Sequence, residues 1–453
     1  MKNFTCCVSC AKTFQSRQGS VLIIVLWITS GLVSIALLFG YAMTLEYRAA
    51  DNSLAGMQAA QAVESAVRYA TYIITNAEEQ GVLPDIDEYE TEWVAMGEST
   101  FWFIGRSVGE SMNDALVSGL VCESSKLNLN TATQEMLEAL PYMTTELAAT
   151  IIDWRDEDED VSENGAESEA YLMRSPAFEC KNAPFETVEE LNLLIGADWD
   201  ILYGEDSNRN GILDANEDDG AESLPEDNRD GRLDCGILEY LTIYSSEPNT
   251  DSDGEERINI NGEDSQELIE LLQEELGEDA ANEVQQKLGS GQTEYKSILE
   301  FFVQSGMEKE DFALIADRIT VSEEVRKGLV NVNTAPEEVL ACIPGIGTDN
   351  SSSLVVYRQS NSGNLDSIAW VSEVLEEADA IEAGEYLTIN SYQFTADVAA
   401  VGHDGKGFQR SVFIIDASGE EPVIRYRKDM NRLGWALGEQ VYREIALAKD
   451  NQK

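Results

Sequence analysis

The residues of this 453-residue chain that are best suited to chemistry are oxygen donors spaced around a glycine. Residues 206–217 read DSNRNGILDANE and fit the twelve-residue calcium loop, with Gly211 at position six, where the chain must turn sharply. Calcium takes six to eight oxygen ligands, and this spacing gathers donors around one point. The predicted ligands are the side chains at positions one, three, five, nine and twelve and the carbonyl at position seven: Asp206, Asn208, Asn210, Asp214, Glu217 and Ile212.

A second, degenerate copy of this loop follows at residues 226–237, which read EDNRDGRLDCGI. Position twelve is Ile237, so a bidentate ligand would have to come from elsewhere, with Asp218 and Asp227 as candidates. Because the flanking segments do not read as two long helices, we expect structural calcium in region 206–237 and not a sensor that opens. The alternative is a solvated acidic turn. The retained positions one, three, five, six and nine are Glu226, Asn228, Asp230, Gly231 and Asp234.

Residues suited to catalysis are scarce. His403 is the only histidine and lies in GHDGKG, a segment typical of a hairpin turn, which disfavours a Ser/His/Asp or Cys/His site. The sequence contains no phosphate-binding loop and no dinucleotide fingerprint. The acidic run 153–158 could suggest paired carboxylates, but such runs are usually solvated faces or cation ligands. We therefore expect no enzymatic activity.

The overall charge also restricts the partners. The chain has 85 acidic and 30 basic residues, for a formal net charge of −55. Binding to nucleic acid or to an anionic membrane surface needs clustered Lys and Arg, so neither is expected as the main partner, whereas divalent cations remain compatible. With 43% apolar and 8% aromatic residues the chain can form real cores, and its length suggests about three domains.

The N-terminal region predicts a membrane anchor. Residues 1–19 contain Lys2, Lys12 and Arg17 and no acid, and residues 21–45 contain no ionisable charge. A helix of that length crosses a bilayer core of about 30 Å. The distribution of charge places the N-terminus in the cytoplasm and the bulk of the chain outside, as a single-pass protein. The amphipathic pattern then continues, so we expect one helix over residues 20–76.

The rest of the chain divides into three predicted parts. Residues 77–125 contain a short aromatic strand, STFWFIGR, and residues 386–453 contain alternating strands at 393–401, 409–415 and 422–426. We expect these two parts to share one antiparallel sheet. Residues 126–385 read as small helical units inserted into that domain, each opened by the same Asn-apolar-Asn pattern, with Thr131 as a candidate helix cap in the first. The pattern occurs at Asn128/Asn130, Asn259/Asn261 and Asn331/Asn333.

One of these units has a glycine-containing turn. Residues 343–347 read IPGIG and resemble the turn of helix-hairpin-helix modules, which presents backbone N–H groups to phosphate. The first copy reads LPYM at residues 140–143 and lacks both glycines, and no cluster of Lys and Arg surrounds either copy. A small helical packing module is therefore favoured over DNA binding.

Cysteines divide between the two sides of the membrane. Cys6, Cys7 and Cys10 lie in the leader. An even number remains in the part expected in an oxidising compartment, which permits three disulfide pairings that the sequence cannot distinguish. These cysteines are Cys122, Cys180, Cys235 and Cys342.

The junction between leader and span points to processing. Cleavage between Gly19 and Ser20 would remove the basic leader and leave the membrane helix on the mature protein. This arrangement resembles the leader of type IV pilins and pseudopilins. Most of these have Glu at mature position five, where this chain has Ile24. That departure, together with the segments LNLNTATQEMLEALP, DWRDEDEDVSENGAESEAYL and VNVNTAPEEVL, resembles the K-type minor pseudopilins of type II secretion systems.

The resemblance implies more than the residues do. It implies a pilin-like α+β fold with a large inserted helical domain able to bind calcium, cleavage by the prepilin peptidase, and methylation of the new N-terminus. It also implies a place in the inner membrane with a periplasmic C-terminal bulk. The partners would be the I- and J-type minor pseudopilins and the major pseudopilin, at the tip of a filament that exports folded proteins. The alternative is a membrane-anchored helix-hairpin-helix protein of a DNA-uptake system.

Overall fold

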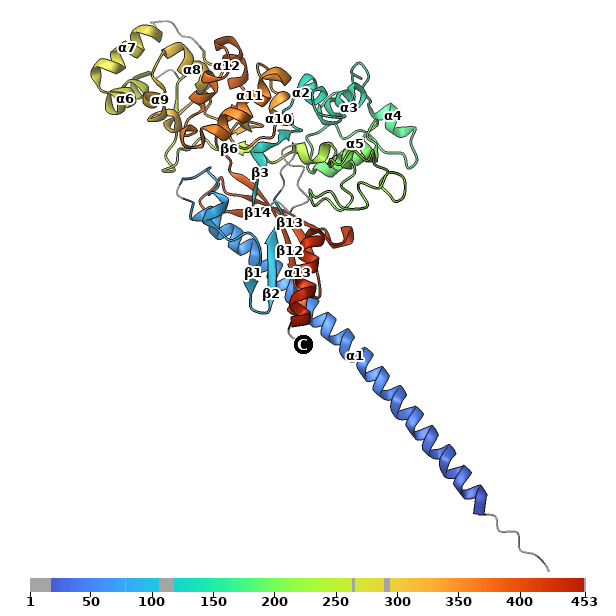
Figure 1. Ribbon diagram of the computed structural model, residues 1–453. Helices are drawn as coiled ribbons and strands as arrows, with labels where there is room; N and C mark the ends of the chain where they lie inside the picture. Colours follow the sequence, from blue (N-terminus) through green and yellow to red (C-terminus); the bar gives the residue numbers. More distant parts are fainter. Residues whose placement is uncertain (1–17, 78, 106–117, 263–264, 289–293, 452–453) are drawn as a thin grey trace, which may run out of the picture.

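The computed structural model describes residues 18–77, 79–105, 118–262, 265–288 and 294–451. Most of the leader, residues 1–17, thus lies outside the described residues. The chain begins with the long helix α1 (Gln18–Thr75), which protrudes from the remainder of the molecule (Figure 1). This confirms the expectation of one continuous N-terminal helix. Its first part is exposed over residues 21–50 and carries no charge over residues 21–45. Among the described helices, α1 is the one that is long and apolar enough to cross a membrane.

The second half of α1 packs on an antiparallel sheet. Small side chains at Ala59, Ala62, Ala66 and Ala70 are almost fully buried, which lets the helix approach the aromatic strands closely. The core between them includes Phe101, Phe103, Val398, Ala400, Phe413 and Ile415. Burial at about every fourth residue along one face of α1 is what a half-exposed amphipathic helix requires.

The sheet joins strands from both ends of the chain. Its order is β1-β2-β12-β13-β14, with the short β3 pairing to one end of β12. All of these pairs are antiparallel, which confirms the predicted α+β fold with a shared sheet. The strands are β1 (Val94–Met96), β2 (Ser99–Phe103), β3 (Val121–Cys122), β12 (Gln393–Val401), β13 (Gln409–Asp416) and β14 (Val423–Asp429).

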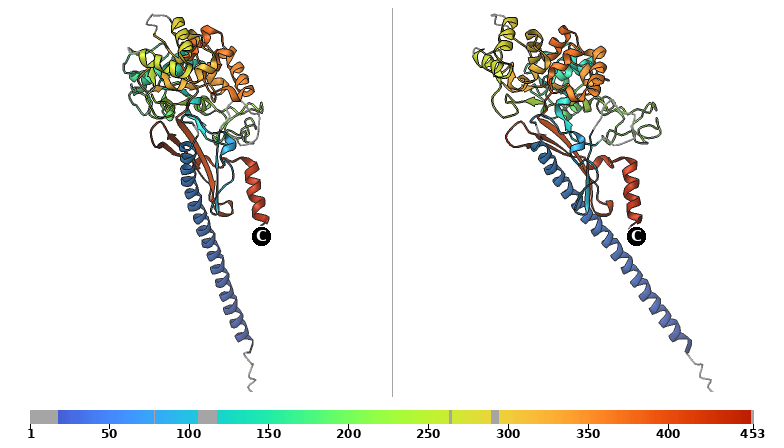
Figure 2. Two further views of the ribbon diagram at one scale, coloured as in Figure 1. Left: turned by 90° about the vertical axis from the view of Figure 1, so that its left-hand side faces the viewer. Right: turned by 60° about the vertical axis from the view of Figure 1, so that its left-hand side comes forward.

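The opposite face of the sheet is covered by the C-terminal segment. Trp102, Ile104, Ala399 and Val401 point to this side and pack against Ala436 and Leu437, which precede helix α13 (Gly438–Asn451). Residues alternate between the two faces of a strand, so β12 contributes to both cores. The sheet is therefore a middle layer between α1 and the C-terminal segment (Figure 2).

The helical region between β3 and β12 lies at the end of the sheet that is remote from the apolar half of α1, as both figures show. The expected boundaries of this inserted region, at residues 126 and 385, remain a prediction. The helices are α2 (Gln134–Glu138), α3 (Thr145–Arg155), α4 (Ser168–Leu172), α5 (Trp199–Tyr203), α6 (Ser265–Leu276), α7 (Glu278–Leu288), α8 (Ile298–Ser305), α9 (Lys309–Ala313), α10 (Glu337–Ala341), α11 (Gly347–Ser360) and α12 (Glu377–Gly384).

Each helical unit is closed by a two-stranded parallel ladder, in which the strand of the Asn-apolar-Asn pattern pairs with a strand at the end of the unit. These ladders are β4 (Leu127–Asn128) with β5 (Leu241–Thr242), β7 (Ile258–Asn259) with β8 (Ile319–Thr320), and β10 (Val330–Asn331) with β11 (Leu387–Thr388). A further antiparallel ladder joins β6 (Ser246–Glu247) to β9 (Arg326–Lys327).

The repeated asparagines have the same role in all three units. The first amide oxygen accepts the backbone N–H two residues later, which closes a turn after the strand. The amide oxygen of the second asparagine accepts a hydrogen bond from a segment more than thirty residues away. The first bonds join Asn128 to Asn130 (2.9 Å), Asn259 to Asn261 (3.0 Å) and Asn331 to Asn333 (2.9 Å). The second donors are Phe185 N (2.7 Å), Tyr295 N (2.8 Å) and Trp370 Nε1 (3.0 Å).

Two smaller expectations change. Thr131 is not the cap of the first helix, because the hydroxyl of Thr133 accepts the N–H of Met136 at 3.2 Å and caps α2 instead. No disulfide joins the four cysteines expected in an oxidising compartment, all of which lie among the described residues. Cys122, Cys180 and Cys342 are buried, and Cys235 is partly exposed.

Candidate functional site

The predicted calcium loop follows α5 and lies against the edge of the helical region that faces the sheet. Asp206 orders its first turn: Oδ1 accepts the N–H of Asn210 (3.0 Å) and Oδ2 accepts that of Gly211 (2.9 Å). Gly211 has φ +72°, a conformation that L side chains rarely adopt, so the turn at position six needs glycine as expected. The loop backbone therefore folds around the first carboxylate.

The other predicted side chains turn into the same region. One oxygen of Asp214 accepts hydrogen bonds from the amides of Asn208 (2.6 Å) and Asn210 (3.2 Å). The Glu217 carboxylate accepts the backbone N–H groups of Asp214 (3.0 Å) and Ser207 (2.9 Å). Residues up to eleven positions apart are thus brought together in one turn of the chain, and Asp206, Asn210 and Glu217 are at most 2% exposed.

The electrostatics of this loop fit a bound cation. Burial, with the nearby charge of Asp206, raises the pKa of Glu217 to about 7. Burial also raises the pKa of Asp214. The amide oxygen of Asn208 is buried and has no hydrogen-bond partner. A buried acceptor without a donor is costly, and a hard cation would satisfy both that oxygen and the crowded carboxylates. The residues present therefore fit calcium.

The loop is held to the sheet by a buried arginine. Arg410 of β13 forms two bonds with Asp397 of β12, Nε to Oδ1 at 2.9 Å and Nη2 to Oδ2 at 2.6 Å. The same guanidinium donates to the backbone carbonyls of Asn208 (2.6 Å) and Arg209 (2.5 Å). The Asn208 amide also donates to the carbonyl of Trp435 at 3.2 Å. The loop is thereby fastened to strands about two hundred residues further along the chain.

The sequence reasoning did not identify Arg410 or Asp397. A signal was present, since Asp397 is the one ionised residue of β12 and Arg410 is the one basic residue of β13. The two strands are neighbours in the sheet and follow each other in the chain. Opposite charges on neighbouring strands often pair across a sheet. What no pattern indicated is that the same arginine also reaches the calcium loop.

The second loop differs from the first. Asn228 and Asp230 are exposed, and their oxygens accept local backbone N–H groups, from Asp230 (2.8 Å) and Arg232 (2.9 Å). Asp234 is partly buried and accepts the N–H of Gly236 at 2.9 Å. These donors are therefore placed in ordinary turns. Of the two substitutes for position twelve, Asp227 already accepts the N–H groups of Asp219 (2.8 Å) and Gly220 (2.6 Å).

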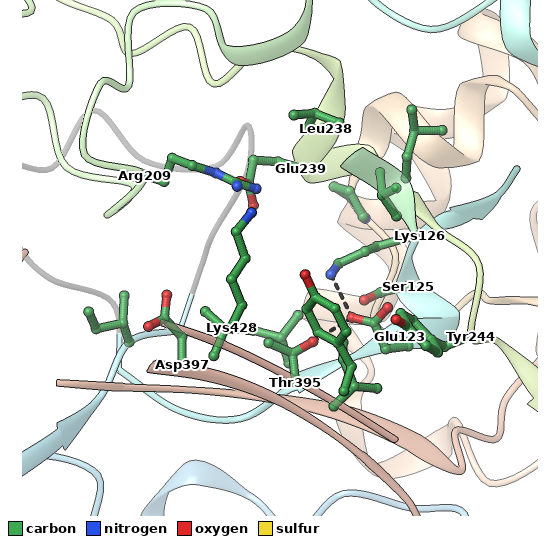
Figure 3. Close-up of a pocket in the computed structure, with 18 of the residues that line it drawn as sticks. Glu123, Ser125, Lys126, Arg209, Leu238, Glu239, Tyr244, Thr395, Asp397 and Lys428 are labelled. Carbon is green, nitrogen blue, oxygen red and sulfur yellow. Dashed lines mark hydrogen bonds and ion pairs between the residues drawn. The ribbon is translucent and has the colours of Figure 1, made fainter. Parts of the chain in front are cut away.

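A cavity of about 240 Å³ lies between the sheet and the helical region (Figure 3). Its charged walls are paired: Lys126 with Glu123 (2.6 Å), Arg209 with Glu239 (3.4 Å), and Lys428 with Glu189 (2.5 Å). Figure 3 shows Lys126 and Thr395 directed at Glu123 from opposite sides. Since opposite charges offset each other in the wall, the cavity does not favour a charged ligand. Other lining residues are Leu238, Leu241, Tyr244, Val412, Ile414 and Tyr426.

The IPGIG turn is engaged inside the protein. A Cβ at Gly345 would lie 2.4 Å from the carbonyl oxygen of Asp379 and 2.9 Å from the N–H of Ala383, both on α12. The side of the turn that would have to approach a phosphate is therefore packed on a helix. The arginines that follow the two hairpins are also engaged within their own units. Arg155 donates to the carbonyls of Leu129 and Ala132. Arg358 donates to the carbonyls of Val332 and Ala335.

The close packing of Gly345 can be tested against a neighbouring glycine. Gly345 (φ +80°) and Gly347 (φ +61°) both have left-handed backbones, but a Cβ at Gly347 would meet no atom within 4 Å. Gly347→Ala should cost only the strain of a left-handed alanine, about 1–2 kcal/mol. Gly345→Ala should cost a further 1–3 kcal/mol or so, because α12 must shift. Chemical unfolding of both variants measures this difference, and equal losses would contradict the packing of Gly345 on α12.

Part of this sequence is similar to proteins of type II secretion systems. A family model described as type II secretion system protein K matches residues 119–203. A curated type II secretion system protein K from Klebsiella pneumoniae is 41% identical over 64 residues, which cover 14% of this chain and 20% of that protein. The match thus spans about a fifth of the length of this relative.

Among solved structures, one similar chain belongs to the GspK–GspI–GspJ complex from the enterotoxigenic Escherichia coli type 2 secretion system. The alignment covers 82% of this chain and 96% of that chain, at 14% identity and a TM-score of 0.36. A TM-score of that size supports no argument about how the present chain is arranged.

Proposed function

Because the chain belongs to the protein K family of type II secretion systems, the K-type minor pseudopilins, we propose that it is the minor pseudopilin at the tip of the pseudopilus. There it initiates and caps a short filament that pushes folded proteins toward an outer-membrane channel. Its work is assembly and interaction, and no enzymatic step is assigned to it. The proposed partners are the I- and J-type minor pseudopilins and the major pseudopilin.

The observation that carries the tip position is the location of the helical region. It lies beyond the end of the sheet that is remote from the apolar half of α1 (Figures 1 and 2). In a filament built from parallel N-terminal helices, the next subunit toward the tip would have to occupy the same space. A bulky domain at this end therefore suits a subunit with no neighbour above it.

The sequence of the membrane segment supports the same position. The carboxylate that most pseudopilins have at mature position five is thought to pair with the N-terminal amine of the subunit ahead. A tip subunit has no subunit ahead, and Ile24 occupies that position here. An ionised group within a bilayer costs several kcal/mol unless it is paired, so an apolar residue is the less costly choice for an end subunit.

Purification of the full-length chain in detergent from cells that also produce the other minor pseudopilins tests this function. We expect the I- and J-type proteins to co-purify in a stable complex, and deletion of the chain to stop secretion of the system's folded substrates. In control cells that produce the tagged chain with the major pseudopilin but without the other minor pseudopilins, that complex should not form. Failure of the tagged chain to retain either minor pseudopilin would count against the tip assignment.

We further propose that the prepilin peptidase cleaves between Gly19 and Ser20, leaving the mature protein in the inner membrane with its bulk in the periplasm. Gly19→Leu should block removal of the basic leader, because the peptidase of this superfamily cuts after glycine. Gly31→Leu is the matched control, since a Cβ there meets no atom within 4 Å. Intact-mass analysis should find the leader on the first variant alone. A mature wild-type chain that retains Lys12 or Arg17 would refute the site.

Calcium is proposed as a structural cofactor of the loop at 206–217. Asp206, Asp214 and Glu217 would supply carboxylates, Asn208 and Asn210 their amide oxygens, and Ile212 its carbonyl. The buried, crowded acids and the amide oxygen of Asn208 support this assignment. A cation there would stiffen the segment that Arg410 fastens to the sheet. Binding by the second loop, through Asn228, Asp230 and Asp234, is a weaker proposal because its donors are mostly exposed.

A further inference from the structure

The single histidine of this chain, His403, lies where the N-terminal helix leaves the rest of the protein. Residues 21–50 of α1 are exposed, and Asp51, which follows them, is partly buried. At this level the helix meets the hairpin that joins β12 to β13, whose tip is formed by residues 402–407. Among the described residues, this is therefore the contact between helix and sheet that lies nearest to the apolar half of α1.

The hairpin lies directly on the backbone of the helix. A Cβ at Gly402 would be 2.2 Å from the carbonyl oxygen of Ala55. A Cβ at Gly407 would be 2.3 Å from the backbone nitrogen of Gly56. Any larger residue at these two positions would push the hairpin away from the helix. This close approach holds His403, which lies between the two glycines, against α1.

Both ring nitrogens of His403 face oxygen atoms of α1. Nε2 lies 2.9 Å from Oδ1 of Asp51, and Nδ1 lies 2.5 Å from Oε1 of Gln58. The orientation of the Gln58 amide is set independently of the ring, because its oxygen accepts the backbone N–H of His403 (3.2 Å) and its nitrogen donates to Glu98 (3.2 Å). Carboxylate and amide oxygens accept hydrogen bonds and cannot donate them, so both bonds require a proton on each ring nitrogen. The geometry is thus that of an imidazolium.

The charges within the hairpin and on α1 are arranged around the same carboxylate. Asp51 also accepts a hydrogen bond from the ammonium of Lys406 at 2.6 Å, and that ammonium lies 3.3 Å from Asp404. Hydrogen bonds from Lys406 and His403 lower the pKa of Asp51. Its carboxylate is therefore ionised throughout the range in which histidine side chains titrate, and it favours a positive charge on the ring.

The other elements packed on the hairpin add one further charge. Glu98, in the turn between β1 and β2, reaches the ring only through the amide of Gln58. Strand β2 itself, STFWF, has no ionisable side chain. Helix α13 approaches the hairpin with the apolar side chain of Ile445. Histidine is the side chain whose charge changes between about pH 5 and 8, whereas carboxylates and lysine keep their charges there.

We propose that His403 is a proton-dependent latch between α1 and the sheet. With a proton on each nitrogen, the ring joins two successive turns of the helix, at Asp51 and Gln58, to the hairpin. Loss of one proton leaves a bare nitrogen facing an oxygen of α1, which removes a hydrogen bond and places two lone pairs against each other. The stabilisation is fully present in acid and is lost as the pH rises. The latch does not depend on the proposed tip function.

Hydrogen exchange of the detergent-solubilised full-length chain tests the latch, with protection expressed relative to an unstructured peptide at the same pH. Between about pH 5 and 8 we expect the protection of residues 401–408 to fall by about fivefold or more, because hydrogen bonds to charged groups are the stronger ones. His403→Gln should remove this pH dependence. Lys406→Gln is the matched control: it removes the other cation bonded to Asp51, so protection should be lower throughout and still fall with pH.

Nuclear magnetic resonance of the same chain, labelled with ¹⁵N-histidine, reports the protonation of the ring without any substitution. Because the chain has one histidine, the spectrum contains a single pair of ring nitrogens. The loss of protection should follow the loss of the ring proton. Protection that stayed constant while the ring lost its proton would overturn the proposal, even if His403→Gln failed to fold. So would an equal pH dependence in the wild-type chain and a folded His403→Gln chain.

Discussion

Replacing Arg410 by methionine is expected to lower the free energy of unfolding by about 3–5 kcal/mol, the loss typical of removing one partner from a buried ion pair. The guanidinium is 0% exposed and the carboxylate of Asp397 is 2% exposed, so water cannot take the place of the lost partner. The carbonyls of Asn208 and Arg209 lose their donor in the same step. The melting temperature of the full-length chain, followed by tryptophan fluorescence, measures the effect.

The matched control is Arg427→Met on the neighbouring strand β14. Arg427 also forms an ion pair, with Glu64 at 2.6 Å, but both side chains are about half exposed. Exposed pairs contribute about 0–1 kcal/mol, so this variant should change little. Adding Asp397→Leu to Arg410→Met should restore part of the stability, because the uncompensated charge is then removed. If the two arginine variants melted at the same temperature, the buried pair would not have the structural importance given to it here.

Removing calcium is the second change with a large expected effect. An ion present at about 100 times its dissociation constant stabilises the form that binds it by about 2.7 kcal/mol. In a domain of this size that corresponds to a fall of about 5–10 °C in melting temperature when a chelator is added. The loss should be concentrated in the helical region and in its contact with the sheet, where Arg410 holds the loop.

A variant of the first calcium loop shows where the ion acts. Asp206→Asn/Glu217→Gln should abolish most of the response to chelator. Magnesium at the same concentration should restore less stability, because it requires a tighter octahedral arrangement of ligands. A wild-type chain whose melting temperature did not respond to chelator would rule out calcium as a source of folding energy.

The sequence by itself determined the features that depend on neighbouring residues. A long uncharged apolar run followed by recurring alanines is sufficient to predict α1, because helix formation and burial of one face follow the local pattern. The alternating strands and the turn at Gly211 were equally local. So was the repeated Asn-apolar-Asn pattern, whose first hydrogen bond spans only two residues in each unit.

Only the tertiary structure decided which distant groups meet. Arg410 reaches the loop at Asn208, Gly345 packs on α12, and Glu167 returns to Asp153 and Asp156. In the sequence the acids of region 153–158 look alike, and folding turns two of them inward and leaves the rest in water. The physical reason is that burial and charge pairing depend on how separate elements pack, whereas residue spacing encodes only the direction of a side chain within its own element.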